Sequence, residues 1–294
     1  MSEYPEGISV IVPCYNEEGA IASVLEQIAL ALKAVSAPSE IIVVDDGSKD
    51  KTAEQIDTSR YRLIRHSHNR GYGAALKTGA HAARYDCIFI TDGDGTYPNE
   101  RIKDIYEQLP GADMVVGARI GQNVNIPLVR RPAKWIIVKL AEFLTGERIP
   151  DLNSGFRATR REVWERYRRY FPDGFSLTTT ITLATLVNGH AVKFVPIDYH
   201  RRVGSSKIRP IRDTMNFVNL ILRTVLYFDP IKVFLPISLG FMALGLFVGA
   251  VTLTLQNAFG IGKFLDITTL LLFLTGINLL AIGALADLIT KRFG

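Results

Sequence analysis

Two carboxylates stand one residue apart where a short apolar run ends, in the sequence Phe89-Ile-Thr-Asp-Gly-Asp94. Asp92 and Asp94 offer hard oxygen ligands, and Mg²⁺ or Mn²⁺ held by such carboxylates usually completes its shell with water and substrate phosphate. The pair is therefore a candidate site for a metal-bound diphosphate. The alternative is a turn in which both aspartates bond only their own backbone. A calcium loop of the EF-hand type is excluded, because Tyr97 and Lys103 stand where it needs Gly and Glu.

Two other polar clusters follow apolar runs in the same way. Pro13-Cys-Tyr-Asn-Glu17 follows residues 8–12, and Asp45-Asp-Gly-Ser48 follows residues 41–44. Each cluster alone suits an ordinary strand-to-helix junction, since Asn, Ser and Asp favour helix N-termini. Together they would bring an aromatic ring, base- and ribose-binding carboxylates and a metal site to one sheet edge. The glycines of Arg70-Gly-Tyr-Gly73 do not match the dinucleotide fingerprint and indicate only a close backbone approach.

The elements that would position these clusters alternate along the chain. Apolar, β-branched runs predict strands at residues 8–12, 41–44, 61–64, 87–91 and 114–116. Helix-periodic segments lie between them, the second of them opening at residues 49–52. Strands and helices that alternate with short connections predict an α/β fold with a doubly wound, mostly parallel sheet, which binds ligands at the carboxyl ends of its strands.

Composition and charge favour some classes of ligand and exclude others. The chain has 294 residues, 48% of them hydrophobic, so it can bury a full domain and still have apolar sequence left over. The net charge of +5 is modest, and basic residues crowd into positions 130–232, which suggests an anionic surface or a phosphorylated ligand. No basic–aromatic interleaving supports a nucleic-acid partner. Cys14 and Cys87 lie in apolar runs and are expected to be reduced, buried thiols. No signal-peptide pattern is present, so export is not expected.

The leftover apolar sequence predicts a membrane hairpin. Residues 233–255 carry no charge and residues 267–289 carry only Asp287, and each stretch is close to the ~20 residues that cross a hydrocarbon core. Basic residues lie outside both ends of the hairpin: Arg223, Lys232, Lys291 and Arg292. Both flanks are therefore expected to be cytoplasmic. Gly245 and Gly249 are spaced for close helix packing, either within the hairpin or in a homo-oligomer.

Two further segments have amphipathic character. Residues 130–145 predict a helix for which a place in the core is the simpler explanation, although a basic, Trp-bearing helix also suits a membrane interface. Residues 211–228 carry one narrow polar stripe, formed by Arg212, Asn216, Asn219 and Arg223. So little polar surface suits a helix half-sunk in a bilayer surface, and the alternative is a helix buried between domains.

Six motifs in this order resemble those of inverting GT-A glycosyltransferases of family 2. They are Val12-Pro-Cys-Tyr-Asn-Glu-Glu18, Val43-Val-Asp-Asp-Gly-Ser48, Asp92-Gly-Asp94, Gly117-Ala-Arg119, Asp151-Leu-Asn-Ser-Gly-Phe-Arg157 and Gly204-Ser-Ser-Lys207. The closer resemblance is to the branch that loads a sugar onto a polyprenyl phosphate, as dolichol-phosphate mannosyltransferases do. It covers about residues 7–210 and implies a GT-A fold.

The resemblance implies a role for each matching residue. The nucleoside would be held by Pro13, Tyr15, Glu17, Val44, Asp45 and Asp46. The diphosphate would be held by Asp92, Gly93 and Asp94, with Mg²⁺ or Mn²⁺ on the two aspartates, and Arg201, Arg202 and Lys207 would close over it from a late loop. The acceptor phosphate would be met by Arg119, Arg131 and Lys134, the last standing where relatives often carry Ser. Asp94, Arg119 and Arg131 are thus the expected catalytic residues, and Asp151 is expected to be structural.

The expected protein is a membrane-anchored glycosyltransferase. It would have a cytoplasmic GT-A domain over residues 1–210, an interfacial helix over 211–230 and a two-helix transmembrane hairpin over 231–294. It would transfer a sugar, with inversion, from a UDP- or GDP-hexose to undecaprenyl or dolichyl phosphate. A hydroxyl acceptor needs a base, whereas a phosphate is already anionic, and residues 175–183, which resemble the acceptor-side helix, hold no Asp or Glu.

Two alternatives stay open at this point. A family 2 enzyme that glycosylates a sugar hydroxyl, as polysaccharide synthases do, would share the donor site but need a general base near the acceptor. A non-catalytic membrane scaffold that binds nucleotide would account for the hairpin but gives no reason for the metal carboxylates.

Overall fold

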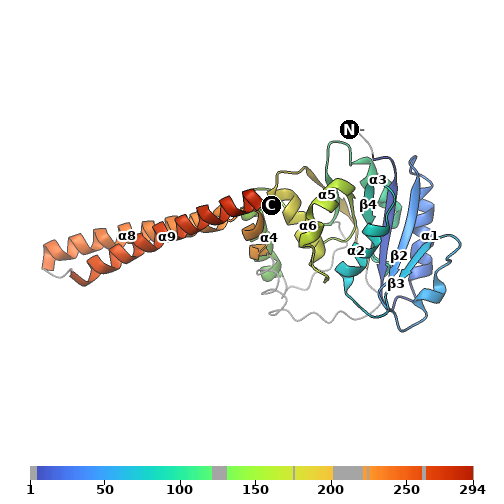
Figure 1. The fold of residues 1–294 in the computed structure, drawn as a ribbon, viewed down its shortest axis with the longest axis horizontal. Helices are drawn as coiled ribbons and strands as arrows, with labels where there is room; N and C mark the ends of the chain where they lie inside the picture. Colours follow the sequence, from blue (N-terminus) through green and yellow to red (C-terminus); the bar gives the residue numbers. More distant parts are fainter. Residues whose placement is uncertain are drawn as a thin grey trace. The chain divides into compact units, whose positions relative to one another are not determined.

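The computed structural model describes residues 5–120, 131–174, 176–200, 221–223, 225–259 and 263–293, with the backbone alone for 131–137, 257–259, 263–266 and 293. The chain forms two compact units, Met1–Ile221 and Leu222–Gly294 (Figure 1). The first unit contains a sheet covered by helices, and the second contains two long helices.

The first unit is built on a seven-stranded sheet in the order β3-β2-β1-β4-β6-β5-β7. Its strands are β1 (Ile8–Cys14), β2 (Ser39–Asp45), β3 (Arg62–Arg65), β4 (Cys87–Ile90), β5 (Met114–Arg119), β6 (Arg157–Arg160) and β7 (Val192–Ile197). Strands β1 to β4 are parallel, β6 is antiparallel to β4 and β5, and β7 is parallel to β5. The predicted mostly parallel sheet is confirmed, with one reversed strand near its centre.

Helices cover both faces of the sheet (Figure 1). They are α1 (Ile21–Leu32), α2 (Tyr72–Ala82), α3 (Ile102–Glu107), α4 (Arg131–Thr145), α5 (Arg161–Tyr167) and α6 (Leu177–Val187), with short 3₁₀ helices η1 (Thr52–Gln55), η2 (Asn99–Arg101) and η4 (Arg168–Tyr170). On one face Val10 of β1 joins the buried cluster that contains Ile28 of α1 and Ile105 of α3. On the other face Gly79 of α2 lies so close to Ile11 that an added Cβ would stand 2.4 Å from that side chain. Neighbouring β1 residues thus face opposite layers.

Several elements differ from the sequence prediction, among them β7, since no strand is predicted beyond residue 116. The helix expected to open at residues 49–52 is only a four-residue 3₁₀ helix, η1. Thr52 is its one buried residue, so it lacks the apolar stripe that would sustain a longer helix. Strand β6 was not predicted, because Arg157-Ala-Thr-Arg160 has no alternating apolar pattern and its pairing with β4 and β5 depends on the rest of the sheet.

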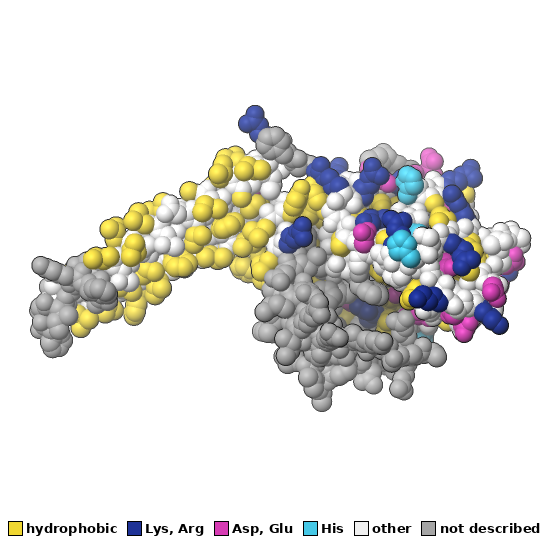
Figure 2. Space-filling model, turned by 60° about the horizontal axis from the view of Figure 1, so that its bottom comes forward, with side chains coloured by type: hydrophobic (Ala, Val, Ile, Leu, Met, Phe, Trp, Pro, Cys, Tyr) yellow, Lys and Arg dark blue, Asp and Glu magenta, His cyan; other side chains and the backbone are white. Residues whose placement is uncertain are grey.

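The second unit is a hairpin of α8 (Ile231–Phe259) and α9 (Lys263–Phe293), which lie side by side (Figure 1). Each contains a 26-residue span long and apolar enough to cross a membrane. Figure 2 shows hydrophobic side chains over the visible surface of this hairpin. A Cβ on Gly245 would stand 2.9 Å from Phe273, and Ser238 Oγ donates a 2.8 Å hydrogen bond to the Gly276 carbonyl. The predicted hairpin is confirmed, and Gly245 packs inside it.

The structure describes the first of the two predicted amphipathic segments as a helix and describes only part of the second. The first is helix α4, in which Ala141 and Leu144 are buried whereas Phe143 is 66% exposed. Residues 211–220 and 224 of the second segment lie outside the described residues. The interfacial helix over 211–230 and its boundaries therefore stay a prediction.

Candidate active site

The carboxyl ends of β1, β2 and β4 surround a cavity of about 350 Å³, a size typical of small-ligand sites. Its walls are Pro13, Cys14, Tyr15, Glu17, Asp46, Asn69, Gly71, Tyr72, Ala75, Asp92, Gly93 and Asp94. These include most of the residues predicted to bind the nucleotide and the metal. Burial raises the pKa of the Cys14 thiol far above its usual range, so Cys14 lines the cavity as an unreactive neutral group.

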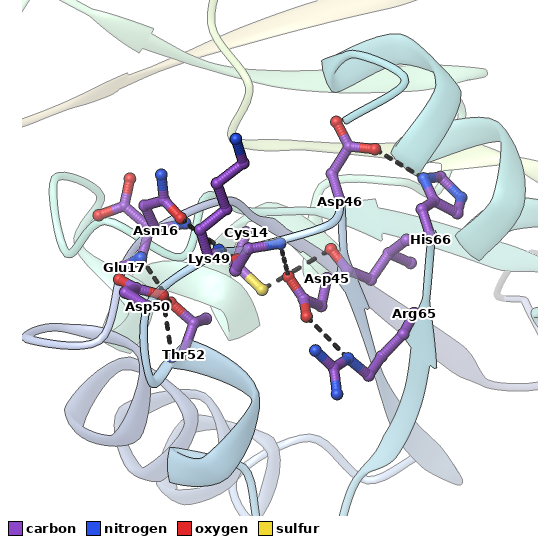
Figure 3. Close-up of polar contacts among 12 residues, drawn as sticks. Cys14, Asn16, Glu17, Asp45, Asp46, Lys49, Asp50, Thr52, Arg65 and His66 are labelled. Atoms are coloured by element: carbon purple, nitrogen blue, oxygen red, sulfur yellow. Dashed lines mark hydrogen bonds and ion pairs between the residues drawn. The ribbon is translucent and has the colours of Figure 1, made fainter. Parts of the chain in front are cut away.

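Hydrogen bonds between two strand-end loops place Tyr15 and Glu17 at this cavity (Figure 3). Asn16 takes a left-handed backbone conformation, with φ of 57°, and its N–H donates to Ser48 Oγ at 3.0 Å. In return Lys49 N–H donates to Asn16 Oδ1 at 2.9 Å. The Glu17 N–H donates to Thr52 Oγ1 at 2.7 Å. Hydrogen bonds therefore join the loops after β1 and β2, and each loop stabilises the part of the cavity wall that the other forms.

The two aspartates after β2 lie in different surroundings (Figure 3). Asp45 is fully buried and does not line the cavity. Its Oδ1 accepts a 2.9 Å hydrogen bond from Ser48 N–H, and its Oδ2 accepts one of 3.1 Å from Arg65 Nε. Val44 likewise lies beneath the loop, where its carbonyl accepts a hydrogen bond from Cys14 Sγ. Both residues thus support the loop that carries Asp46.

Asp46 reaches the cavity and is held by backbone and by a histidine. Its carboxylate accepts hydrogen bonds from the N–H groups of Arg70 at 2.9 Å and Gly71 at 2.8 Å. His66 Nδ1 lies 2.6 Å from Asp46 Oδ1, and His66 Nε2 lies 2.9 Å from Thr78 Oγ1. A carboxylate only accepts, so Nδ1 is the donor in this pair. His66 is a supporting residue that the sequence motifs did not indicate.

Asp92 and Asp94 are both half-buried at the cavity, and different groups hold them. Asp94 Oδ1 accepts hydrogen bonds from Thr96 N–H at 3.1 Å and Thr96 Oγ1 at 2.6 Å, as the turn alternative expects. Asp92 Oδ1 instead accepts a 2.8 Å hydrogen bond from Tyr72 Oη. Burial raises the pKa of Tyr72 well above its usual value, so its hydroxyl remains a donor at neutral pH.

This oxygen donor set suits Mg²⁺ or Mn²⁺. Two carboxylates are hard oxygen ligands, which these cations bind together with phosphate oxygens and water. Among the described residues no group of three His, Cys, Asp or Glu side chains could hold an ion. The described residues therefore fit an ion that shares its shell with the diphosphate, and among them no closed protein site is formed.

Arg119 at the end of β5 is bound to the loop that precedes β6. Its Nε and Nη2 donate to the two carboxylate oxygens of Asp151 at 2.7 and 3.0 Å, and its backbone N–H donates to Asp151 Oδ2 at 3.0 Å. The guanidinium also lies over the ring of Tyr199, 5.2 Å from its centroid. Nη1 is the guanidinium nitrogen that the Asp151 pairing does not use. The structural role expected for Asp151 stays a prediction.

The same loop lies against Asp92. A Cβ on Gly155 would stand 2.7 Å from Tyr72 Oη and 3.1 Å from Asp92 Oδ1. The Gly155 N–H donates to Tyr97 Oη at 2.7 Å. Arg157 is completely buried beside them, where it donates to the carbonyls of Ser154 and Thr178, and burial lowers its pKa to about 10. The sequence does not predict these contacts, and those of Gly155 with Tyr72 and Tyr97 join segments far apart in the chain.

For the other predicted site residues the structure describes no side chain, so their place at this cavity stays a prediction. Helix α4 carries Arg131 and Lys134, but only its backbone is described there. Arg201, Arg202 and Lys207 lie outside the described residues. Helix α6, which overlaps the segment compared with the acceptor-side helix, is buried from Leu177 to Leu186 and holds no carboxylate.

Comparisons with known proteins agree with this fold. The family model described as glycosyl transferase family 2 matches residues 9–168, and the model described as GtrB C-terminal hairpin matches residues 229–291. The dolichyl-phosphate hexose transferase of Haloferax volcanii is 31% identical over 71% of this chain and 90% of its own length. The undecaprenyl-phosphate 4-deoxy-4-formamido-L-arabinose transferase of Pseudomonas paraeruginosa is 27% identical over 100% of this chain and 88% of its own.

Solved structures show the same fold at lower identity. Glucosyl-3-phosphoglycerate synthase from Mycobacterium tuberculosis, in complex with Mn²⁺, UDP and phosphoglyceric acid, gives a TM-score of 0.59 at 20% identity, covering 75% of this chain and 78% of that one. The same enzyme in complex with Mg²⁺ and UDP gives a TM-score of 0.58 at 22% identity, covering 75% and 79%. These likenesses establish the GT-A fold of the first unit.

Proposed function

The chain belongs to glycosyltransferase family 2, and from this we propose that it transfers a sugar from a nucleotide-sugar to a polyprenyl phosphate at the membrane. The observation that carries the proposal is the cavity, in which Asp46, Asp92 and Asp94 meet from the ends of two different strands. Relatives named for transfer to dolichyl or undecaprenyl phosphate match 71% and 100% of the chain, which supports this acceptor class.

The donor nucleotide would occupy the cavity. Tyr15 and Glu17 would contact the nucleoside from the loop after β1, and Asp46 would accept hydrogen bonds from it, since a carboxylate only accepts. Pro13 and Gly93 complete the wall between them. Val44 and Asp45 act indirectly in this proposal, because they support the loop from below the cavity. The nucleobase would be uracil or guanine, because the proposed donor is a UDP- or GDP-hexose.

Asp92 and Asp94 would hold Mg²⁺ or Mn²⁺ together with the diphosphate. When bound, such an ion stabilises the negative charge of the leaving nucleoside diphosphate. The two carboxylates are already held in place by Tyr72 and Thr96. Arg201, Arg202 and Lys207, outside the described residues, would bind the phosphates from the late loop.

The acceptor phosphate would attack without help from a protein base. A phosphate monoester is anionic at neutral pH, whereas a sugar hydroxyl must lose a proton as it attacks. Asp151 is engaged by three donors from Arg119 and helix α6 holds no carboxylate, which favours the phosphate acceptor over the hydroxyl one. Arg119, through the edge that Asp151 does not use, would bind the phosphate with Arg131 and Lys134.

The hairpin would place the reaction at a membrane. Its two apolar spans of 26 residues each make it a membrane anchor by length and composition, and the GtrB hairpin model covers it. We place the catalytic unit and the C-terminus in the cytoplasm, because Lys291 and Arg292 follow α9 and Lys232 stands at the start of α8. A polyprenyl chain would remain in the bilayer while its phosphate reaches the catalytic unit.

Substitution of the metal carboxylates tests the function. Asp92→Asn and Asp94→Asn keep the size of the side chain but remove its charge, so each should abolish transfer of radiolabelled sugar to the lipid without lowering the melting temperature. Asp86→Asn is the matched control, since Asp86 is a 58% exposed side chain at the start of β4 and outside the cavity. Near-normal transfer by Asp92→Asn and Asp94→Asn in metal-free buffer would refute the metal site.

A further inference from the structure

The two metal carboxylates differ in what fixes them. Asp94 Oδ1 accepts two hydrogen bonds from Thr96, a residue of the same turn. The partner of Asp92 is Tyr72, the first residue of α2, which reaches the end of β4 from a different element. The orientation of Asp92 therefore depends on the position of α2.

Tyr72 is itself firmly placed by the backbone around it. Gly71 has a φ of 102°, and a Cβ there would stand 2.5 Å from the Asp173 carbonyl oxygen. A Cβ on Gly73 would stand 2.2 Å from the Pro172 carbonyl oxygen, and the Ala74 N–H donates to the Asp173 carbonyl at 3.1 Å. The close backbone approach that the two glycines indicated is thus an approach to the loop before α6. The glycines on both sides of Tyr72 let this loop fix the start of α2.

The opposite side of the Tyr72–Asp92 hydrogen bond is closed as well. Gly155 leaves no room there, because a Cβ at this position would stand within 3.3 Å of both Asp92 carboxylate oxygens and 2.7 Å from the Tyr72 hydroxyl. Tyr97 Oη in turn holds the Gly155 N–H. The Asp92 carboxylate therefore lies between a tyrosine hydroxyl and a glycine backbone, and its rotation about the Cβ–Cγ bond is restricted.

We propose that Tyr72 is a positioning residue for the metal site: its hydroxyl fixes the Asp92 carboxylate in the orientation that binds the cation together with the diphosphate. This rests on the proposed metal site at Asp92 and Asp94. Groups that hydrogen-bond a metal-binding carboxylate pre-orient it, and their loss typically lowers metal affinity by ~10–100-fold. A hydroxyl that served packing alone would leave the affinity for the metal unchanged.

The test is Tyr72→Phe, which removes the hydroxyl and keeps the ring. Binding of Mn²⁺ to the purified full-length protein is measured by electron paramagnetic resonance with saturating UDP, and again with GDP. The dissociation constant for Mn²⁺ should rise at least about tenfold in the variant. In transfer assays the Mn²⁺ concentration for half-maximal rate should rise by a similar factor, while kcat at saturating Mn²⁺ returns to within about twofold of the parent protein.

Tyr61→Phe is the matched control. Its hydroxyl also donates to a carboxylate, Glu26 Oε1 at 3.2 Å, but neither residue lines the cavity. This variant should bind Mn²⁺ as the parent does. Gly155→Ala provides a second approach from the other side of Asp92, because its methyl group would displace the carboxylate or the Tyr72 hydroxyl. It should also weaken Mn²⁺ binding, and it serves if Tyr72→Phe does not fold.

The variant Asp92→Asn distinguishes a failure of the proposed metal site from a failure of the proposed role of Tyr72. If the parent protein shows no nucleotide-dependent Mn²⁺ binding, or if Asp92→Asn keeps it, the metal site itself is wrong. If Asp92→Asn loses Mn²⁺ while Tyr72→Phe and Gly155→Ala bind it with parental affinity, the metal site stands and the role of Tyr72 is refuted. A kcat that stays low in Tyr72→Phe at every Mn²⁺ concentration, with unchanged affinity, would also refute it.

Discussion

Arg119 and Asp151 form a two-point ion pair, in which Nε and Nη2 of the arginine donate to separate oxygens of the carboxylate at 2.7 and 3.0 Å. The Asp151 side chain is 2% exposed and that of Arg119 is 23% exposed, so the pair is largely removed from water. It joins the end of β5 to the loop before β6. One contact thus orients a predicted acceptor-binding arginine and closes the loop that backs Asp92.

Asp151→Asn should destabilise the protein and reduce transfer. Removing one partner of a buried pair leaves the other charge uncompensated, which typically costs ~3–5 kcal/mol. The melting temperature of the purified protein in detergent measures the effect. Asp86 forms a more exposed and longer ion pair with Arg161, at 3.9 Å. Its loss in Asp86→Asn should change the free energy of unfolding by less than ~1 kcal/mol. Equal melting temperatures for the two variants would contradict this account of the pair.

His66→Leu should raise the KM for the nucleotide-sugar about tenfold and change kcat by less than about threefold. The histidine orients Asp46, which is proposed to bind the donor in the ground state and in the transition state alike. Steady-state kinetics over a range of donor concentrations separates the two constants. His68→Ala is the control, because His68 is exposed and bonds only its neighbour Ser67 among the described residues. A lowered kcat with unchanged KM would assign His66 a different role.

Tyr97 should make the folded protein sensitive to alkali. Burial, and next the charge of Asp92, raise the pKa of Tyr97 above its usual value. Stability from the neutral hydroxyl is then complete below the unfolded pKa of ~10 and is lost as pH rises through the folded pKa. The melting temperature should fall above pH ~10 less steeply in Tyr97→Phe than in the parent. At neutral pH that variant should lose about 1 kcal/mol, since Gly155 N–H loses its acceptor. Parallel pH profiles would contradict the assignment.

The orientation of the hairpin is testable by labelling. A membrane-impermeant maleimide should label Lys263→Cys in intact cells, and Arg292→Cys only after the membrane is permeabilised. Cys14 and Cys87 are buried, so background labelling should be low. The opposite pattern would place the catalytic unit outside the cell or in an organelle lumen.

Much of the fold follows from local sequence. Strands β1, β2 and β4 are mostly apolar in their buried stretches, Ser9 and Asp45 excepted, and the polar residues directly after them form the cavity wall. The parallel arrangement then brings those loops to one edge without any further information. The hairpin is equally local, because its two apolar runs are longer than any helix that the structure describes in the first unit.

The contacts that hold the site residues in place could not be predicted from local sequence. His66, Tyr72 and Gly155 act through partners on other elements, and each residue type is common in ordinary turns and helix starts. Asp45 and Asp46 are adjacent and identical, yet one holds the loop and the other faces the cavity. That difference depends on Arg65 and His66, which β3 brings alongside β2.

The central claim is that this glycosyltransferase uses a polyprenyl phosphate as acceptor. The purified protein is supplied with radiolabelled nucleotide-sugar and Mg²⁺ or Mn²⁺, and with polyprenyl phosphate, free polyprenol or soluble sugars in parallel reactions. Labelled lipid is expected from polyprenyl phosphate alone, with a rate that falls on the acid side near pH ~6, where the phosphate gains its second proton. Transfer to polyprenol or to a sugar hydroxyl at a comparable rate would contradict it.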